Sequence, residues 1–178
     1  MDQLFAPWRI DWVTREQPTK ADACAFCSIP ERDDHREALF VATAEESYVL
    51  LNNYPYSPGH ALIVTHRHVE SFLDLDPAEL LSTNQLVQRT IAAMEQSMNP
   101  DGFNVGMNIG RGAGGSIDHL HVHVVPRWSG DTNFMAVVGD TKVIVQALDE
   151  TYTLLHGAFA DHVGMDITPD DGAVPLDV

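Results

Sequence analysis

The stretch Asp118-His119-Leu120-His121-Val122-His123-Val124-Val125-Pro126-Arg127 decides the fold, because it places three of the chain's nine histidines at a spacing of two. Side chains alternate between the two faces of a β-strand, so the pattern predicts a strand that buries Leu120, Val122 and Val124. The imidazoles would then line the opposite face, which we expect to be open to solvent. Neighbouring imidazoles would lie about 6.5–7 Å apart, a spacing that suits a metal ion or a polyphosphate chain.

The composition predicts one soluble domain. The chain has 178 residues, of which 44% are hydrophobic, which is enough for one proper core but few for two. No apolar run approaches the ~20 residues of a membrane span, and Met1-Asp2-Gln3 does not open a secretion signal. We therefore expect a cytoplasmic protein with no membrane partner.

The charge balance argues against nucleic acid as a partner. Acidic residues number 26 against 10 basic ones, and the formal net charge is −16. Long-range attraction to a polyanion is therefore weak. A nucleotide is not excluded, because cations and backbone N–H groups can bind an anion locally, and Arg111, Arg127 and the histidines lie in one stretch.

The only two cysteines form one unit, Cys24-Ala25-Phe26-Cys27. This spacing fits half of a tetrahedral zinc site, a thioredoxin-like redox pair or a disulfide. A redox pair expects a preceding strand and a following helix, whereas Ser28-Ile29-Pro30 follows here. The sequence context therefore favours zinc.

We predict an α+β fold with a five-stranded antiparallel sheet, a long packing helix and a C-terminal helix. Asp76-Pro77-Ala78-Glu79 is typical of a helix start, with an N-cap, a proline at the first helical position and a glutamate at the third. That helix should cover about residues 77–97, and a second helical pattern lies within residues 137–155. The strands, which are apolar runs bounded by turn residues, cover residues 38–44, 48–52, 60–66 and 103–108 and the histidine stretch.

The expected organisation is one catalytic domain over residues 24–134, extended by a helical segment over residues 135–164. Residues 1–23 form an aromatic arm, whose Trp8 and Trp12 would pack on the domain or on a second subunit. Residues 165–178 form an acidic tail that we expect to be frayed or docked on the surface.

Two further motifs complete the pattern. Pro58-Gly59-His60 is a turn that delivers a histidine to the start of an apolar strand. The loop from Asn108 to Ser116 has four glycines in six residues, which allows backbone N–H groups to approach a ligand closely, as phosphate loops require.

With these motifs, the sequence resembles the histidine-triad (HIT) family of nucleotide hydrolases and transferases. The resemblance covers roughly Cys24 to Phe134 and includes Thr65-His66-Arg67-His68-Val69 and the histidine strand. The ending from Pro126 to Phe134 looks most like the branch of diadenosine tetraphosphate hydrolases and phosphorylases. It implies a dinucleoside polyphosphate or a mononucleotide as ligand, and a homodimer whose two sheets join, with Trp8 and Trp12 as candidate interface residues.

The resemblance also implies site residues. His121 would attack the α-phosphorus, with its other ring nitrogen held as N–H by a backbone carbonyl. His123 would contact the phosphate and help the leaving group depart, and His60 would support the site. Substrate binding would involve Asn52, Asn108, Gly115, Ser116, Arg127 and Trp128.

A structural zinc site is implied by the same resemblance. Its ligands would be Cys24, Cys27, His68 and His119, which leaves His66 outside. Four protein ligands close the coordination sphere, so no metal-bound water would be available for catalysis.

The acceptor of the nucleotidyl group stays open. Many hydrolases of the family have a glutamine just before the position of Ser116, but this chain has Gly115. Together with Trp128, this looks more like the phosphorylase type, in which inorganic phosphate replaces water. Other readings are a nucleoside phosphoramidate hydrolase, a non-catalytic nucleotide-binding protein, and a site in which the histidines hold a catalytic metal.

Overall fold

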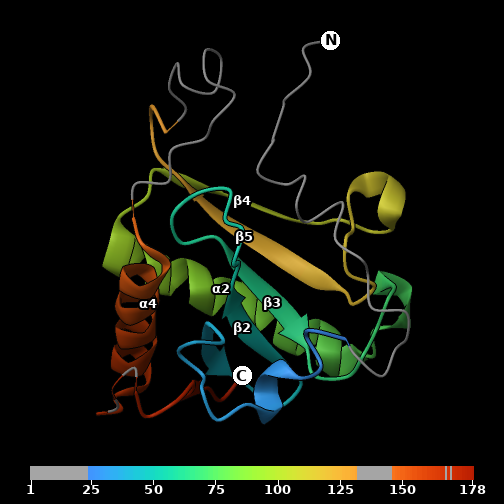
Figure 1. The fold of residues 1–178 in the computed structure, drawn as a ribbon, viewed down its shortest axis with the longest axis horizontal. Helices are drawn as coiled ribbons and strands as arrows, with labels where there is room; N and C mark the ends of the chain where they lie inside the picture. Colours follow the sequence, from blue (N-terminus) through green and yellow to red (C-terminus); the bar gives the residue numbers. More distant parts are fainter. Residues whose placement is uncertain (1–23, 132–145, 167, 169) are drawn as a thin grey trace.

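The computed structural model describes residues 24–131, 146–166, 168 and 170–178. The fold is α+β, as predicted, with one sheet in the strand order β4-β5-β3-β2-β1-β6 (Figure 1). The strands are β1 (Phe40–Thr43), β2 (Ser47–Leu51), β3 (Ala61–Thr65), β4 (Gly102–Met107), β5 (His121–Arg127) and β6 (Val174–Pro175). The helices are α2 (Pro77–Met98) and α4 (Leu148–Val163), with short 3-10 turns η3 (Ile29–Glu31), η4 (Phe72–Asp74) and η5 (Arg111–Ala113).

The five predicted strands are confirmed, and all pairings among them are antiparallel. The sheet has a sixth strand that we did not predict. β6 belongs to the tail and pairs in parallel with β1, and Leu176 N–H then donates to the Thr43 carbonyl over 2.7 Å. A two-residue strand containing a proline has no alternation for a sequence pattern to detect.

Helix α2 begins where its capping residues predict. The Asp76 side chain accepts from the Glu79 N–H, and the Glu79 side chain accepts from the Asp76 N–H, so both halves of a capping box are present. The helix ends at Asn99, which adopts a left-handed conformation just before Pro100. Its 22 residues therefore form one continuous helix that packs on the sheet.

The second predicted helix continues further along the chain than predicted. Residues 132–145, including most of the predicted start, lie outside the described residues, as does the arm with Trp8 and Trp12. Within the described part, α4 begins at Leu148 and continues to Val163, where Gly164 ends it in a left-handed conformation. The helix thus extends eight residues beyond the predicted range.

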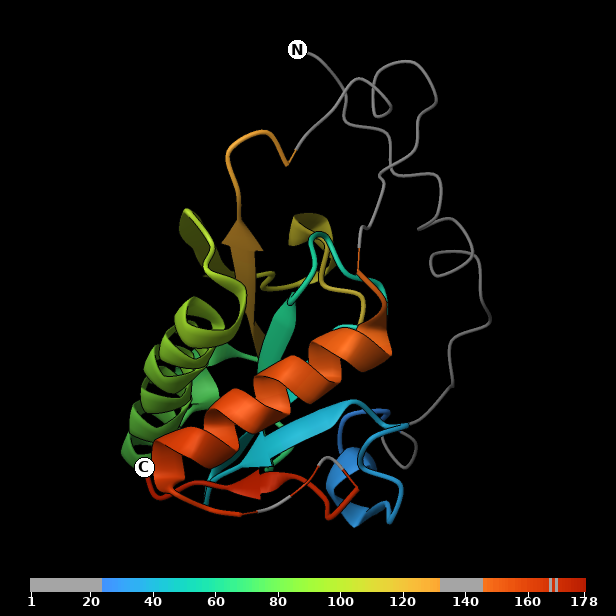
Figure 2. The ribbon, with the colours of Figure 1, turned by 90° about the vertical axis from the view of Figure 1, so that its left-hand side faces the viewer.

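The two faces of the sheet are covered differently. Helices α2 and α4 pack on one face, while the segment of residues 24–39 lies against the other (Figures 1 and 2). The larger core joins the first face to the helices through residues such as Ile63, Leu86 and Phe159. The smaller core joins the second face to segment 24–39 through Phe26, Tyr48 and Leu62.

The histidine face is not open to solvent, contrary to our expectation. Segment 24–39 covers it, so His119 is only 1% exposed and His121 only 8% exposed. The strand itself behaves as predicted on its other face, where Val122 and Val124 join the larger core. Among the described helices, none is long and apolar enough to span a bilayer.

Candidate active site and metal site

His121 and His123 project from β5 on the face covered by segment 24–39. His121 lies opposite Val64 of β3, and His123 lies opposite Leu62. His119 lies two residues before β5 and is also buried, and the Phe26 ring packs against both His119 and His121 in T-shaped arrangements. The three predicted histidines are therefore adjacent, but each has a different set of partners.

His121 is held in the tautomer that a nucleophile requires. Its Nδ1–H donates to the backbone carbonyl of His119 over 2.7 Å, which is the predicted bond. In the neutral ring, Nε2 then carries a lone pair. Burial lowers the pKa of the His121 imidazole, although the hydrogen bond to His119 acts in the opposite direction. The neutral, nucleophilic form is thereby favoured.

His60 and His123 form a directional hydrogen-bond chain. The Tyr56 backbone N–H donates to Nδ1 of His60 over 3.0 Å, so neutral His60 carries its hydrogen on Nε2. That hydrogen is donated to Nδ1 of His123, 2.9 Å away, and the hydrogen of neutral His123 then lies on Nε2. Nδ2 of the Asn108 side chain lies 3.3 Å from this nitrogen. The two ends of an amide are assigned from the hydrogen-bond network, and turning this amide brings its oxygen to the position that accepts from Nε2–H. His123 thus presents a donor on the side of Asn108.

A cavity of about 270 Å³ lies against these groups. Its polar lining includes Asn52, Asn108 and Ser116, as predicted, together with His121 and His123. Apolar walls with a few convergent polar groups are typical of small-molecule sites. The apolar walls come from the sheet, segment 24–39 and the loop before β5, and include Phe26, Ile29, Leu50, Leu62 and Ile117.

The glycine loop turns tightly beside the cavity. Gly110 and Gly114 have φ angles of 78° and 91°, which a side chain would strain. A side chain at Gly115 would be crowded, since an added Cβ would lie 3.0 Å from the carbonyl oxygens of Asn108 and Gly110. A glutamine at this position would therefore require these backbone atoms to shift by a few tenths of an ångström.

The predicted metal ligands come together as one cluster. The Sγ atoms of Cys24 and Cys27 and one ring nitrogen each of His68 and His119 lie within 4.8 Å of one another. The distances from Nδ1 of His119 to the two sulfurs are 3.4 and 3.5 Å, and Nδ1 of His68 is 3.3 Å from the Cys27 sulfur. A tetrahedral zinc ion, with bonds of about 2.3 Å to sulfur and 2.0 Å to nitrogen, would separate such atoms by about 3.5 Å.

The surroundings of the cluster also fit a metal ion. Nε2–H of His119 donates to the Thr65 carbonyl over 2.9 Å, so the Nδ1 lone pair faces the sulfurs. Burial lowers the pKa of His119 to about 4, which keeps the ring neutral as a ligand must be. Burial and the adjacent Cys24 raise the pKa of Cys27 to about 11, and a bound cation would reverse that effect. The cluster could therefore hold a metal ion.

Three other residues named in the sequence analysis do not line the first cavity or join the metal cluster. His66 bonds to the Thr43 hydroxyl and the Ala44 carbonyl, away from the metal cluster. Arg127 pairs with Asp131 and borders a second cavity of about 430 Å³. Trp128 donates from its indole N–H to the Asn99 carbonyl and lines neither cavity.

The sequence reasoning missed several residues of the site. Phe26 stands between the two cysteines and contacts His121, and Tyr56 stacks on His60 at a ring distance of 4.5 Å. Phe26 lies inside the cysteine motif and Tyr56 two residues before Pro58, but nothing in a single sequence distinguishes such an aromatic residue from ordinary core. The Thr65 carbonyl left no signal, because backbone atoms carry no residue identity.

Comparisons with known proteins agree with this geometry. The HIT domain family model matches residues 34–130. A Mycobacterium tuberculosis protein named AP-4-A phosphorylase is 43% identical over 166 residues, covering 87% of this chain and 83% of the relative. A bis(5′-adenosyl)-triphosphatase of Dictyostelium discoideum is 33% identical over 92 residues, covering 52% of this chain and 62% of the relative. A zinc-bound histidine triad family protein from Mycobacterium smegmatis has a TM-score of 0.68 and 27% identity, covering 82% of this chain and 99% of that one.

Proposed function

We propose, from the premise that this chain belongs to the HIT domain family, that it cleaves a dinucleoside polyphosphate through a nucleotidyl intermediate on His121. The observation that carries the proposal is the His121 tautomer, with Nδ1–H on a carbonyl and the Nε2 lone pair available beside a cavity. By their names, the two curated relatives act on substrates of this class. The protein is an enzyme of the HIT phosphorylase or hydrolase type.

In the first step, Nε2 of His121 attacks the α-phosphorus and a P–N bond forms. The bond from that phosphorus to the bridging oxygen breaks, and the leaving nucleoside polyphosphate takes the electron pair. Nδ1–H of His121 stays on the His119 carbonyl, which stabilises the positive charge that develops on the ring. No strong base is required, because the neutral imidazole is already nucleophilic.

His123 and its neighbours would act on the phosphate oxygens. Nε2–H of His123 is aimed as a donor and can stabilise the leaving oxygen. The Asn108 amide and the Ser116 hydroxyl border the same cavity and can bind nonbridging oxygens. His60 acts through His123, whose tautomer it sets.

In the second step, an acceptor attacks the same phosphorus and releases His121. Water would make the enzyme a hydrolase, and inorganic phosphate would make it a phosphorylase. Glycine at position 115 supports the phosphorylase, because the chain has no glutamine side chain there to bind the leaving oxygen or a water molecule.

The metal in this proposal is zinc, with a structural role. Cys24, Cys27, His68 and His119 would complete its coordination, so no open position remains for water. The ion would fasten segment 24–39 to the start of β5, and segment 24–39 forms one wall of the cavity.

A homodimer also belongs to the proposal. β4 is an edge strand of the sheet, and Val105 on it is 48% exposed. The opposite edge is occupied by β6. Pairing of two β4 edges around a twofold axis would join the sheets of two copies, and light scattering in solution measures this directly.

The test of function is incubation with diadenosine tetraphosphate, with and without inorganic phosphate, followed by chromatography of the products. We expect ADP and ATP in equal amounts, formed only when phosphate is present. AMP and ATP formed regardless of phosphate would identify a hydrolase. Absence of turnover with either acceptor would overturn the proposal and favour a phosphoramidate substrate or a binding protein.

A further inference from the structure

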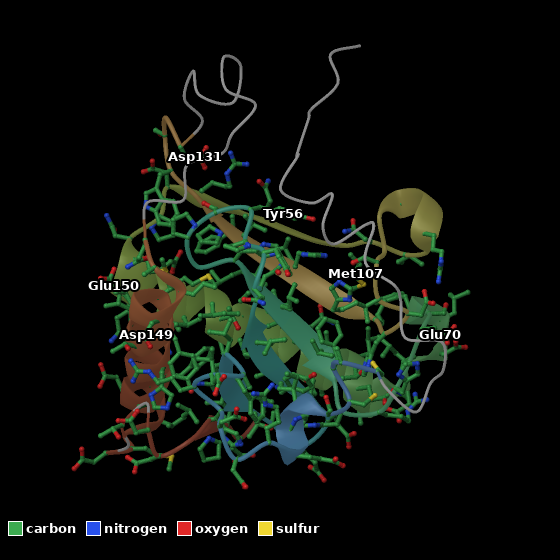
Figure 3. The ribbon with its side chains drawn as sticks, in the orientation of Figure 1. Tyr56, Glu70, Met107, Asp131, Asp149 and Glu150 are labelled. Carbon is green, nitrogen blue, oxygen red and sulfur yellow. The ribbon has the colours of Figure 1, made fainter. Side chains whose placement is uncertain are left out.

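The cavity of about 430 Å³ has no role in the mechanism described so far. It lies on the same face of the sheet as the 270 Å³ cavity, and both cavities are lined by Asn108 and His123. Figure 3 labels Tyr56 and Met107, which border the larger cavity from the loop between β2 and β3 and from the end of β4. The two cavities therefore meet at the residues that would bind the phosphates.

The strand register shapes this second cavity. His123, Val125 and Arg127 succeed one another on one face of β5, at about 6.5–7 Å between neighbours. Gly106 of β4 lies opposite His123, and Asn104 lies opposite Val125. A Cβ added to Gly106 would meet no atom within 4 Å, so the absence of a side chain there leaves open space beside His123.

Polar and aromatic groups line the cavity at both ends. Nη1 of Arg127 donates to the Asn104 side-chain oxygen over 2.9 Å, and the guanidinium also pairs with Asp131. The Tyr56 ring stacks near His123 at a ring distance of 5.9 Å. An aromatic face, a guanidinium and an amide together suit a ligand that carries both a base and phosphates.

The first cavity is too small for a whole dinucleoside polyphosphate, since pockets for a single drug-sized ligand have about 300–1,000 Å³. One nucleoside would occupy it, with the α-phosphate at His121 and the phosphate chain passing His123. The larger cavity continues from His123, which lines both cavities.

We propose that the cavity lined by Tyr56, Asn104, Gly106 and Arg127 binds the leaving half of the substrate, a nucleoside polyphosphate. This inference rests on the proposed function, whose cleavage step requires that half to depart past His123. The site would select dinucleoside polyphosphates over nucleotides with a small leaving group.

The test is Gly106→Val, which fills the cavity with a side chain that a strand accommodates readily. Two substrates are compared, diadenosine tetraphosphate and adenosine 5′-phosphoramidate, which share the adenosine half but differ in leaving group. We expect the ratio of kcat/KM for the first to that for the second to fall at least about tenfold, since a pocket change of this size alters discrimination by roughly 10–200-fold. Gly102→Val, also on β4 and also without an atom within 4 Å of the added Cβ, is the matched control.

An unchanged ratio in Gly106→Val, or an equal fall in Gly102→Val, overturns the subsite. Binding gives a second readout that does not need turnover: calorimetric titration of the His121→Gln protein with diadenosine tetraphosphate and with AMP. Adding Gly106→Val to that protein should weaken the former selectively, and equal weakening of both overturns the subsite. Failure of the proposed function is distinguished from these results, because it appears as no cleavage of diadenosine tetraphosphate by the unmodified protein.

Discussion

His119 and His121 are two residues apart, yet they use opposite ring nitrogens. Nε2–H of His119 donates to the Thr65 carbonyl, and its Nδ1 faces the sulfurs of Cys24 and Cys27. Nδ1–H of His121 donates to the His119 carbonyl, which leaves Nε2 as the basic nitrogen. Each ring gives one hydrogen to a backbone carbonyl, but the position of that carbonyl differs.

This difference shows that, in this site, backbone carbonyls determine which ring nitrogen of each histidine keeps its lone pair. A ring nitrogen can bind metal or attack phosphorus only as a lone pair, so the carbonyl that takes the hydrogen fixes which nitrogen remains. Both rings are buried, so burial alone does not separate a metal ligand from a nucleophile. The following predictions test this separation.

The largest expected effect is on turnover, when the proposed nucleophile His121 is replaced. His121→Ala should lower kcat for diadenosine tetraphosphate by about 10⁴-fold or more, because loss of a nucleophile removes the covalent route. Its metal content should stay at the level of the unmodified protein, since His121 contributes no ligand atom to the cluster. Single-turnover kinetics and elemental analysis measure the two effects.

His119→Ala is the matched variant for that experiment. It should lose the bound metal, and its kcat should fall much less than that of His121→Ala. Because His121 is buried, His121→Ala also leaves a space in the protein and should reduce the free energy of unfolding by about 1–3 kcal/mol. Retained turnover in a folded His121→Ala protein would contradict the nucleophile assignment.

The next largest effect is on metal content and stability, when one of the proposed metal ligands is replaced. Cys24→Ser should remove bound zinc and lower the free energy of unfolding by about 4 kcal/mol or more, because metal binding is coupled to folding. At 25 °C, kcat should change much less, since His121 keeps its bond to the His119 carbonyl. Calorimetric melting, zinc analysis and steady-state kinetics are the measurements.

Ser28→Ala is a control in the same segment, because the Ser28 hydroxyl donates to the nearby Ala25 carbonyl and Ser28 is not part of the metal cluster. A collapse of kcat in folded Cys24→Ser protein, with Ser28→Ala unaffected, would show that the metal takes part in the chemistry.

The smallest effect concerns the loop that carries His68, one of the proposed metal ligands. Arg67, its neighbour, pairs with Glu79, which is 1% exposed, and also donates to the Asp74 carbonyl. The pair lowers the pKa of Glu79. Its stabilisation is therefore present above the unfolded pKa of about 4.3 and is lost as the pH falls through the lower folded value.

Glu79→Gln should reduce the free energy of unfolding at pH 7 by about 1–3 kcal/mol, and the difference from the unmodified protein should shrink in acid. Urea unfolding at pH 7 and pH 3.5 measures both. The exposed residue Glu95 on the same helix offers the control Glu95→Gln. A difference that grew on acidification would reverse the sign and disprove the role of the pair.

Much of the fold could be predicted from local patterns. The strand from His121 was visible because apolar and imidazole residues alternate, and the start of α2 because Asp76, Pro77 and Glu79 stand at capping positions. The metal cluster was available only through resemblance, because Cys24 and His119 are 95 residues apart and no periodicity links them.

Other features depend on contacts that a sequence does not display. The alternation in β5 indicates that the imidazoles share a face, but the cover over that face is segment 24–39, which is distant in sequence and has no regular pattern. Strand β6 forms because the tail meets the edge of β1. The tautomers of His119 and His121 depend on backbone carbonyls, for which residue types give no signal.

Phe26 connects the metal cluster at His119 with the cavity beside His121. It stands between Cys24 and Cys27, contacts His121 at a ring distance of 5.2 Å, and its carbonyl accepts from the Tyr48 hydroxyl over 2.7 Å. A metal that holds the two cysteines in place would also hold Phe26 in place, which forms part of the wall of the 270 Å³ cavity. Reciprocity then requires that a nucleotide raise the affinity for the metal by the factor by which the metal raises the affinity for the nucleotide. Where metal is scarce, the substrate itself would help the enzyme to retain its ion.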